Sequence, residues 1–577
     1  MAGLPELLAA ALQPAFDLVE PGADPVVRPS SRPGIDFQAN GAMAVGKRSG
    51  RPPAEVAGRV AAAGGLEGVA TLEVAPQGFI NIHLDEGWLA GRVAALAADP
   101  RLGVATAAVA RTMLVDYSSP NVAKEMHVGH LRSTVIGDAL VRMLEFAGHR
   151  VIKENHVGDW GTQFGMLIEH LLDLGEEAAA QELSVGDLDG FYRQARAAFD
   201  ASEEFQDRSR RRVVLLQSGD AETNRLWRIL VDQSLAYFDE MYARLGVLLT
   251  SRDVVGESSY NPLLPVVVEE LAGKGLLVDS AGAKCVFPPG FTGRDGEPLP
   301  LIVQKSDGGY GYATSDMAAL KDRFGRMGVD QALYVVGSPQ SQHFAMCFAA
   351  GVEAGYLPAV DRAVHIAFGS VLGPDRKMLK TRSGETVKLV DLLDQAQARA
   401  AAVVAERGEL SDEEQAKVAR MVAMGAVKYA DLSTDRIKDY VFDLDRMVTF
   451  DGNTAPYLQY ARVRCLSIFR RAERDAATHL ASGVPLLLSE PGERALALGL
   501  LGFVSAVDET LTTWSPHKLC TYLFDLAGLY TSFFESCPVL KAPTPELRDS
   551  RLVLCALTAD VLGRGLDLLG IDTPERM

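Results

Sequence analysis

An apolar strand-like run, a turn with two histidines and a helical pattern follow one another without a break, and they constrain the fold more than any other feature. Residues 112–117 form the apolar run, residues 118–130 the turn, and residues 131–146 the helical pattern. A strand, a glycine-containing turn and a helix in this order bring the backbone close to a nucleotide in α/β folds. The segment therefore predicts an α/β sheet with a nucleotide site at the turn.

The turn carries His127 and His130 on either side of Gly129. Gly129 has no Cβ, which leaves room for an adenine ring to lie against the chain. The two imidazoles would donate hydrogen bonds to phosphate oxygens, supported by the helix N-terminus behind them. A solvated helix start, or two of several metal ligands, would also explain a histidine pair. The strand–turn–helix context and the upstream Lys124 favour the nucleotide site.

The chain is too long for one compact core. Its 577 residues predict roughly two to four domains. Residues 1–108 mix helix and strand patterns, as an α+β domain does. Residues 109–400 alternate short β-rich runs with helices, which predicts a Rossmann-type parallel sheet with a helical insertion at about 176–250. Residues 401–577 are almost entirely helical in pattern and predict a helical bundle, so the fold class is multidomain, α/β plus all-α.

Individual elements can be expected in two of these regions. In the first, they are an opening helix, a helix at 38–49 and strands at 71–74 and 79–82. The strands expected in the parallel sheet are 113–117, 151–155, 332–336 and 363–368.

Cysteine usage and charge exclude several classes of protein. The six cysteines are scattered without a Cys-x-x-Cys pair, which argues against a disulfide framework and a zinc knuckle. A net charge of −18 disfavours nonspecific polyanion binding but allows a nucleic acid bound by local basic faces. No apolar run approaches the ~18–20 residues that span a bilayer, and the N-terminus lacks a basic leader. We expect a cytoplasmic protein that does not bind membranes.

A basic segment at 377–384 is the second candidate for the nucleotide site. It follows the strand expected to end near Phe368 and a turn at 373–375. Its cations, Lys377, Lys380 and Arg382, would hold the polyphosphate of ATP as pyrophosphate leaves. Short basic loops are often only solvated surface, and the histidine turn upstream is what favours the phosphate interpretation.

The two segments resemble the His-x-Gly-His and Lys-Met-Ser-Lys signatures of class I aminoacyl-tRNA synthetases. The second match is imperfect, because Leu379 replaces the serine. The frame 380–384 also fits a variant found in one branch of that family. In that branch a lysine just before the histidine turn supplies the missing charge, and Lys124 occupies that place.

Further stretches across nearly the whole chain resemble arginyl-tRNA synthetases specifically. They are residues 36–40, 78–82, 156–165, 304–308, 312–316, 427–432, 453–461 and 570–577. So many matches in the same order argue against coincidence. The resemblance implies a catalytic parallel-sheet domain, an N-terminal domain that contacts tRNA and a C-terminal helical domain that binds the anticodon.

The resemblance also assigns an arginine pocket. Its residues are Ser119, Asn121, His130, Glu257, Tyr312, Asp316 and Gln340. Asp316 and Glu257 would supply carboxylates to the planar guanidinium, and Tyr312 would hydrogen-bond the same group. Asn121 and Gln340 would orient the α-amino and carboxylate ends.

Simpler interpretations exist for both acids. Asp316 could complement a helix dipole, and Glu257 could be an ordinary loop acid. Tyr312 and Asp316 are four residues apart and share a face if they open a helix. A pocket of this kind rejects lysine, whose ammonium leaves acceptors unpaired.

The reaction implied has two steps and needs no general base, because the nucleophile is already ionised. The arginine carboxylate attacks the α-phosphorus of ATP and expels pyrophosphate, and a terminal ribose hydroxyl of the tRNA then attacks the adenylate. The residues expected to stabilise the charge are Lys124, His127, Gly129, His130, Lys380 and Arg382, with Mg²⁺ on the polyphosphate. ATP would be bound by His127, Gly129, His130, Lys377, Lys380 and Thr381. No zinc or other protein-bound metal is expected.

For tRNA, the helix expected from Tyr457 to Arg474 carries the strongest pattern. Tyr457, Tyr460, Arg464 and Arg471 recur at spacings of three, four and seven and share a face. Aromatics that stack on bases beside arginines that meet phosphates suit an anticodon, although a core stripe with snorkelling arginines would give the same pattern. The tRNA-binding residues expected are Asn40, Tyr457, Tyr460, Arg464 and Met577.

Two other functions are compatible with parts of this pattern. One is a synthetase for another amino acid. The other is a noncatalytic tRNA-binding paralogue, which would have no chemical need for His127, His130, Lys380 or Asp316. A monomer is expected from the resemblance, with arginine tRNA, L-arginine and ATP as partners.

Overall fold

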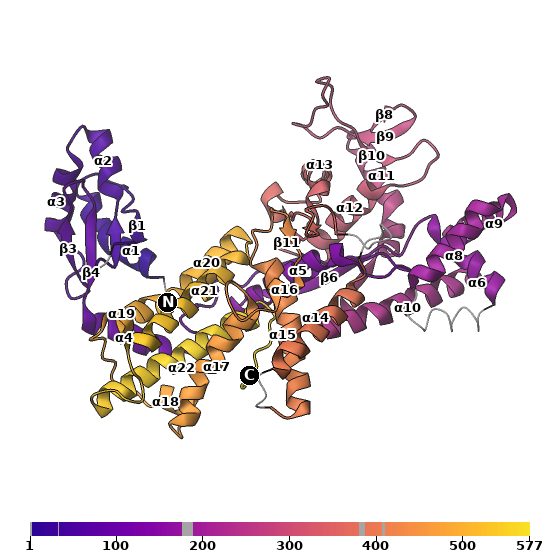
Figure 1. The fold of residues 1–577 in the computed structure, drawn as a ribbon. Helices are drawn as coiled ribbons and strands as arrows, with labels where there is room; N and C mark the ends of the chain where they lie inside the picture. Colours follow the sequence, from indigo (N-terminus) through magenta and orange to yellow (C-terminus); the bar gives the residue numbers. More distant parts are fainter. Residues whose placement is uncertain (1–2, 33, 176–187, 380–386, 407–409) are drawn as a thin grey trace. The chain divides into compact units, whose positions relative to one another are not determined.

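The computed structural model describes residues 3–32, 34–175, 188–379, 387–406 and 410–577 (Figure 1). The chain forms two compact units. The first unit contains residues 1–106, 450–567 and 573–577, and the second contains residues 107–449 and 568–572. The expected domain boundaries at 108 and 400 stay predictions, and Lys380, Thr381 and Arg382 lie outside the described residues.

The second unit is built around the parallel sheet. Its elements up to the end of the helical insertion are β5 (Thr112–Asp116), α5 (Val128–Phe146), β6 (Arg150–Val157), α6 (Gln163–Leu174), α8 (Leu188–Ala201), α9 (Glu203–Gln217) and α10 (Ala221–Leu245). The middle of the unit contains η1 (Ser251–Asp253), β7 (Val254–Gly256), η2 (Glu257–Leu263), α11 (Leu264–Gly273), β8 (Val278–Ser280), β9 (Ala283–Val286), β10 (Leu301–Gln304), α12 (Tyr312–Lys321) and η3 (Asp322–Arg326). The remainder is β11 (Gln331–Tyr334), η4 (Ser338–Gln340), α13 (Ser341–Glu353), η5 (Val360–Arg362), β12 (Ala363–His365), β13 (Val371–Leu372), α14 (Leu389–Ala405), α15 (Asp412–Leu432), β14 (Tyr440–Val441) and α16 (Leu444–Met447).

The predicted parallel sheet is confirmed, with the strand order β12-β11-β5-β6-β7 and every neighbouring pair parallel. All four expected strands are present, and β7 is an addition that the sequence pattern did not reveal. The chain starts at β5, builds β6 and β7 on one side, and then crosses to β11 and β12 on the other. The strand order therefore reverses between β5 and β11, and open α/β sheets bind ligands at the carboxyl end of such a reversal.

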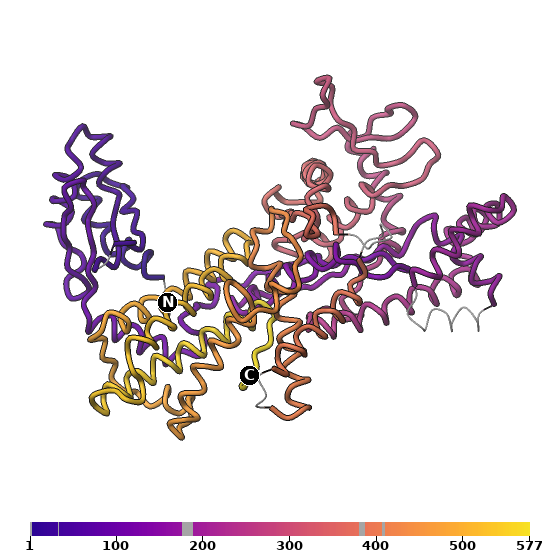
Figure 2. Tube along the Cα trace, viewed as in Figure 1, coloured from indigo at the N-terminus to yellow at the C-terminus, as the bar shows by residue number. Residues whose placement is uncertain are grey.

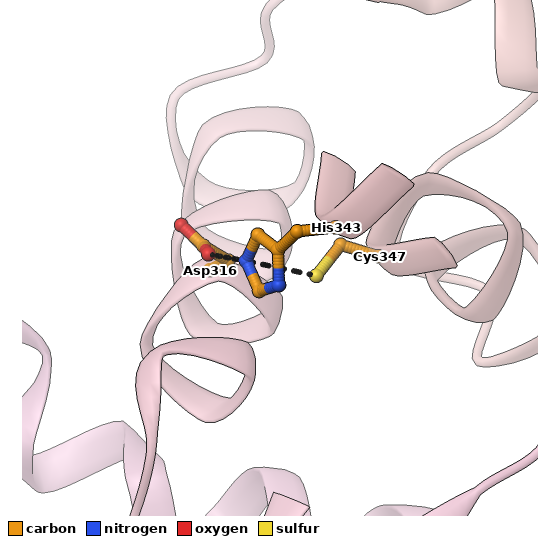
Figure 3. A group of neighbouring side chains, drawn as sticks. All are labelled: Asp316, His343 and Cys347. Carbon is orange, nitrogen blue, oxygen red and sulfur yellow. Dashed lines mark hydrogen bonds and ion pairs between the residues drawn. The ribbon is translucent and has the colours of Figure 1, made fainter. Parts of the chain in front are cut away.

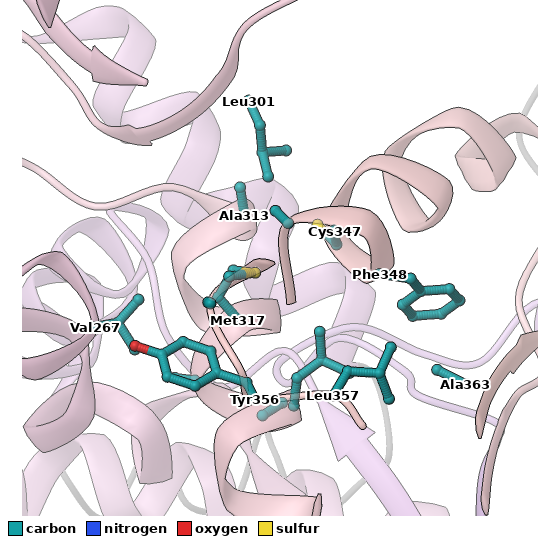
Figure 4. Packing of buried hydrophobic residues seen from close by; sticks show 14 of the residues in the cluster. Val267, Leu301, Ala313, Met317, Cys347, Phe348, Tyr356, Leu357 and Ala363 are labelled. Atoms are coloured by element: carbon teal, nitrogen blue, oxygen red, sulfur yellow. The ribbon is translucent and has the colours of Figure 1, made fainter. Parts of the chain in front are cut away.

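Helices α11, α12 and α13 pack with β10, β11 and β12 to form a continuous apolar core. Figure 4 shows Met317 of α12 and Phe348 of α13 among the side chains of this core. Each fully buried side chain of this size stabilises the fold by about 1.5–3 kcal/mol. The core thus fixes the two helices that carry the polar residues of the site described below.

Within the segment expected to be a helical insertion, the described residues 188–245 form helices α8, α9 and α10. Helices α6, α8, α9 and α10 form one group (Figure 1). Glu169 of α6 lies between two arginines of α9, with 2.7 Å ion pairs to Arg208 and to Arg212. Helix α15 packs against α14 and α5 within the second unit. Helices α14 and α15 follow the basic segment in sequence, as the trace in Figure 2 shows.

The first unit combines a small antiparallel sheet, in the order β1-β2-β4-β3, with helices. Its N-terminal elements are α1 (Leu4–Asp17), β1 (Val27–Pro29), β2 (Phe37–Ala39), α2 (Gly41–Ser49), α3 (Pro53–Ala63), β3 (Ala70–Val74), β4 (Ile80–Leu84) and α4 (Glu86–Ala97). Its C-terminal elements are α17 (Ala455–Arg471), α18 (Ala476–Leu480), α19 (Pro491–Leu501), α20 (Phe503–Thr513), α21 (His517–Ser536) and α22 (Pro545–Leu568, whose last residue is assigned to the second unit).

The helix expected at 38–49 was placed too early. Residues Phe37–Ala39 form strand β2 instead, and the helix begins at Gly41. The physical reason is tertiary: Phe37 and Ala39 are buried by pairing between β1 and β4, and Gln38 donates a 2.8 Å hydrogen bond to Asn81 of β4. A three-residue alternation of buried and partly exposed side chains, as in Phe37–Ala39, is hard to distinguish from a helix start when the partner strand is not known.

Among the described residues, Pro491–Thr513 is one stretch whose length and hydropathy would suffice for a membrane span, although no such stretch was expected. Half of its most apolar 18 consecutive residues is buried, and Gly502 divides the stretch into α19 and α20. Buried Glu493 of α19 also forms a 2.6 Å ion pair with Arg551 of α22. These are features of core helices in a bundle.

Candidate active site

The expected substrate-site residues lie in segments that leave the carboxyl ends of neighbouring parallel strands. Ser119 and Asn121 follow β5, Glu257 follows β7, and Gln340 follows β11. Parallel strands end at the same edge of a sheet, so the topology brings these segments together. Helix α12 places Tyr312 and Asp316 one turn apart, as expected. Asp316 lies beyond the first turn of α12, which removes the dipole interpretation of its carboxylate.

The turn after β5 has an unusual backbone. Ser118, Ser119 and Ala123 have φ values of 73°, 51° and 62°. Side chains from three other elements hold it. The backbone N–H groups of Ser118, Ser119 and Ala123 donate to Ser133 Oγ, Asn155 Oδ1 and Ser234 Oγ at 2.9, 3.0 and 2.9 Å. Left-handed conformations of this kind persist only where the surroundings determine them, and they cluster at functional sites.

A buried network of charged side chains contacts this turn through Asp116. Arg323, of which only 1% is exposed, donates to Asp116 Oδ2 at 2.7 Å and to Glu154 Oε1 at 2.5 Å. Asp116 also accepts a 3.1 Å hydrogen bond from the Ser119 hydroxyl. Burial alone would raise the pKa of Glu154, but Arg323 and His156 outweigh it and bring the pKa to about 2. Asp116, Glu154 and His156 have ligand atoms close enough for a metal ion, yet the guanidinium already supplies the cation there.

Sequence reasoning missed Arg323. It occupies a π-helical turn, η3, directly after α12. The sequence analysis found no signal at this position, and only the fold shows that Arg323 reaches Asp116 and Glu154.

The two histidines cap α5 reciprocally. Gly129 N–H donates to His127 Nδ1 at 3.0 Å, and His127 N–H donates to His130 Nδ1 at 3.1 Å. Because Nδ1 accepts in both rings, the neutral tautomer assigned to each carries its proton on Nε2. A Cβ at residue 129 would lie 2.8 Å from His127 Cε1, so glycine is needed for this arrangement.

Both imidazoles are kept neutral. Burial lowers the pKa of His127, and burial together with the neighbouring His127 lowers the pKa of His130 to about 3. The ring centroids are 3.9 Å apart. The turn therefore presents two neutral rings with N–H donors at the N-terminus of α5.

Residues 387–389, which follow the basic segment, contact the histidine turn. Val128 N–H donates to the carbonyl of Val387 at 3.1 Å, and Leu389 N–H donates to that of Met126 at 2.8 Å. Lys388 Nζ forms a 2.9 Å ion pair with Glu125. A tight turn precedes the basic segment, and in it Gly373 N–H donates to the carbonyl of Lys377 at 2.8 Å.

Two of the expected basic residues are described. Lys377 is exposed. Lys124 Nζ lies 4.5 Å from the ring centroid of Tyr192 on α8, a cation–π distance. Lys124 also helps to lower the pKa of His127, so its charge is close to the histidine turn.

Carboxylates crowd the expected arginine pocket. Burial, reinforced by the charges of Asp159 and Asp316, raises the pKa of Glu257 to about 7, although His156 opposes the shift. Asp159 was not among the expected residues. Its Oδ1 accepts from Ser258 N–H at 2.9 Å and its Oδ2 from Ser258 Oγ at 2.6 Å, directly beside Glu257. Among the described residues, no lysine or arginine forms an ion pair with Glu257 or Asp316.

Asp316 has a histidine partner from the facing helix. His343 Nε2 lies 2.5 Å from Asp316 Oδ2 and 3.6 Å from Cys347 Sγ, and Figure 3 shows His343 between the two. The ligand atoms of these three side chains are close enough for a metal ion. Tyr312, Asn121 and Gln340 are exposed, Tyr312 to 77%.

Three of the expected tRNA residues, Tyr457, Tyr460 and Arg464, lie on a half-buried stripe of α17. The Tyr457 ring is 5.7 Å from Phe524, and the Tyr460 ring is 6.1 Å from Phe450. The Arg464 guanidinium lies 4.9 Å from the centroid of Phe534. The stripe therefore packs against neighbouring aromatics while remaining partly accessible. Asn40 immediately precedes α2, and Met577 is the last residue.

Family models match three consecutive parts of the chain. The model of the class I (R) tRNA synthetase catalytic domain matches residues 93–444. The DALR anticodon binding domain model matches residues 458–577, and the arginyl tRNA synthetase N-terminal domain model matches residues 3–84. The parallel sheet and the histidine turn thus belong to a class I aminoacyl-tRNA synthetase.

Relatives specify the family. The arginine–tRNA ligase of Thermobifida fusca (strain YX) is 52% identical over 569 residues, 98% of each chain. That of Escherichia coli (strain K12 / DH10B) is 50% identical over 557 residues, 96% of each chain. The solved arginyl-tRNA synthetase of Thermus thermophilus has a TM-score of 0.82 at 28% identity, and that of Plasmodium falciparum has 0.85 at 29%, with full coverage of both chains. The chain belongs to the arginyl-tRNA synthetase family, and its function is that of an arginine–tRNA ligase.

Proposed function

We propose that the carboxylates around Glu257 bind the arginine guanidinium and that the histidine turn binds ATP, so that the two substrates meet above β5 and β11. The observation that carries the proposal is the raised pKa of Glu257, about 7. Burial and nearby carboxylates make its ionised form costly, which is the state of a site adapted to a cationic ligand. A bound guanidinium would relieve this cost.

The preference for arginine follows from the planar geometry of its charged group. A guanidinium is planar, stays charged and donates in fixed directions, so carboxylates on two facing elements can accept parallel hydrogen bonds from it. We assign this role to Asp316 and Glu257, with Tyr312 as a further hydrogen-bond partner. Ser119, Asn121 and Gln340 would hold the α-amino and carboxylate ends, and His130 would contribute from the histidine turn. Lysine, with one tetrahedral ammonium, would leave acceptors unpaired.

The neutral histidines suit charge stabilisation without proton transfer. His127 and His130 would each donate Nε2–H to phosphate oxygens, and Gly129 would let the adenine approach the chain. The α-phosphorus then lies within reach of the arginine carboxylate, and positioning replaces general-base catalysis. The departing pyrophosphate would be held by the positive charges of Lys124, Lys377, Lys380 and Arg382 and by the hydroxyl of Thr381.

Arginine tRNA completes the reaction. The adenylate carbonyl would be attacked by a hydroxyl of the 3′-terminal ribose, with release of AMP. Tyr457, Tyr460 and Arg464 would contact the anticodon loop by stacking and by phosphate pairing. Asn40 and Met577 would add contacts to the same tRNA.

The proposal extends to the metal, the oligomeric state and the location of the protein. Mg²⁺ would enter with ATP as part of the substrate, and zinc would not be required. The protein would act as a cytoplasmic monomer without a membrane partner, with its domains divided at about residues 108 and 400.

Pyrophosphate exchange into ATP tests the proposal directly. Each of the twenty amino acids would be assayed with and without unfractionated tRNA, alongside the D316N and E257Q variants. Exchange with arginine alone, and a raised arginine KM in both variants, is the expected result. Exchange at the wild-type arginine KM in both variants would refute the pocket assignment while leaving the family unaffected.

A further inference from the structure

The pair formed by Asp316 and His343 joins two helices that belong to different segments of the sheet domain. Asp316 lies on α12, and His343 lies near the start of α13. The Nε2–Oδ2 distance of 2.5 Å indicates a strong hydrogen bond (Figure 3). The side chains are 25% and 29% exposed, so the pair is accessible rather than part of the sealed core.

The histidine itself is held in place by its own helix. Cys347, one turn further along α13, is fully buried and places Sγ 3.6 Å from Nε2 of His343. The adjacent Phe344 packs its ring 5.6 Å from the imidazole, and both Phe344 and Cys347 belong to the apolar core. The imidazole is therefore a fixed donor and not a free surface group.

A fixed donor on one carboxylate oxygen fixes the whole carboxylate plane. The terminal torsion of an aspartate is broad when no partner restrains it. With Oδ2 engaged by His343, the plane is set and Oδ1 is left to accept from another group. The direction of that oxygen matters to a planar donor with two N–H groups, but it matters little to an ammonium, which can rotate.

We propose that His343 is a positioning residue that orients the Asp316 carboxylate toward the arginine guanidinium and thereby contributes to the choice of arginine over lysine. The inference rests on the proposed role of Asp316 and assigns His343 no contact with the reacting atoms.

Two amide variants of different reach test the inference. In H343Q the amide nitrogen reaches approximately the position of Nε2 and keeps the hydrogen bond, whereas in H343N it stops near the position of Nδ1. H343N is expected to raise the arginine KM in pyrophosphate exchange by about tenfold, the usual effect of losing a hydrogen bond to a charged group. The kcat should change little, the relative rate with lysine should rise, and H343Q should restore most of the arginine affinity.

The controls separate this inference from the proposed function. H83N alters another histidine–carboxylate pair, the 3.3 Å contact between His83 and Glu73 in the first unit, and should leave arginine KM unchanged. Thermal unfolding of each variant reports whether it is folded. If D316N raises the arginine KM but H343N and H343Q both match the wild type, His343 has no positioning role. If D316N itself has no effect, the proposed pocket is wrong, and His343 loses its role with it.

Discussion

Lowering the pH from 8 to 6 is expected to weaken arginine binding by about tenfold, because it protonates Glu257. Burial, with Asp159 and Asp316 nearby, raises the pKa of this carboxyl from 4.5 to about 7 in the free protein. A bound guanidinium favours the ionised carboxylate, so arginine binding at pH 7 should release roughly half a proton. Below pH 7 the affinity should then fall with falling pH toward a limit of about one decade per unit.

Calorimetric titration with arginine in two buffers of different ionisation enthalpy measures the proton release directly. The E257Q variant cannot ionise at this position, so its binding should be weaker and should show neither the release nor the pH dependence near 7. A wild-type titration without proton release, together with an arginine KM that is flat between pH 6 and 8, would refute the reasoning.

The raised pKa of Glu257 also affects folding stability, but in the opposite direction: protonation at low pH weakens arginine binding and stabilises the fold. An unfolded glutamate titrates near 4.5 and the folded one near 7, so the cost of ionising Glu257 is absent below the lower value and complete above the higher one. The shift corresponds to about 3 kcal/mol at 1.36 kcal/mol per unit. E257Q should therefore be more stable than the wild type at pH 8 and gain little near pH 4, as measured by urea unfolding. E270Q is the matched control, because Lys321 lowers the pKa of Glu270 and reverses the sign.

Three further perturbations give separate outcomes. G129A places a Cβ 2.8 Å from the His127 ring and should raise the KM for ATP at least tenfold in the exchange assay. The arginine KM should stay unchanged in the same assay, and an unaltered ATP KM would contradict the role of the turn. R323M removes the guanidinium that pairs with the buried carboxylates of Asp116 and Glu154 and should lower the free energy of unfolding by about 3–5 kcal/mol, measured by urea denaturation. A loss below about 1 kcal/mol would show that the network is not stabilising. R464A should weaken tRNA binding and reduce the slope of log affinity against log salt by about 0.7–0.9, the value for one phosphate contact. An unchanged slope would place Arg464 in packing alone.

The histidine turn was predictable because its geometry is local. The strand Thr112–Asp116, the turn and the helix from Val128 follow one another in sequence. The capping bonds among His127, Gly129 and His130 span at most three residues. The alternation of short β-rich runs with helical stretches along residues 109–400 also predicted four strands of the parallel sheet. The β2 strand was misread because Phe37–Ala39 is short, and its partners, Val27–Pro29 and Ile80–Leu84, are supplied by other segments of the chain.

The supporting residues of the site could not be predicted from local patterns. Arg323 contacts Asp116 from 207 positions away, and His343 contacts Asp316 from 27. Asp159 lies in a stretch that resembles the family, but its proximity to Glu257 follows only from the pairing of β6 with β7. Sequence shows which residue types are available, and the fold decides which of them become neighbours.

The sequence by itself determined the family, the reaction class and the residues expected to act, since these depend on the types and order of side chains along the chain. The tertiary structure alone decided their ionisation and orientation. Burial keeps His127 and His130 neutral and raises the pKa of Glu257, because removal from water disfavours a charge whatever the neighbouring sequence. The orientation of Asp316 depends on a histidine from the facing helix, and that contact exists only once α12 and α13 have packed together.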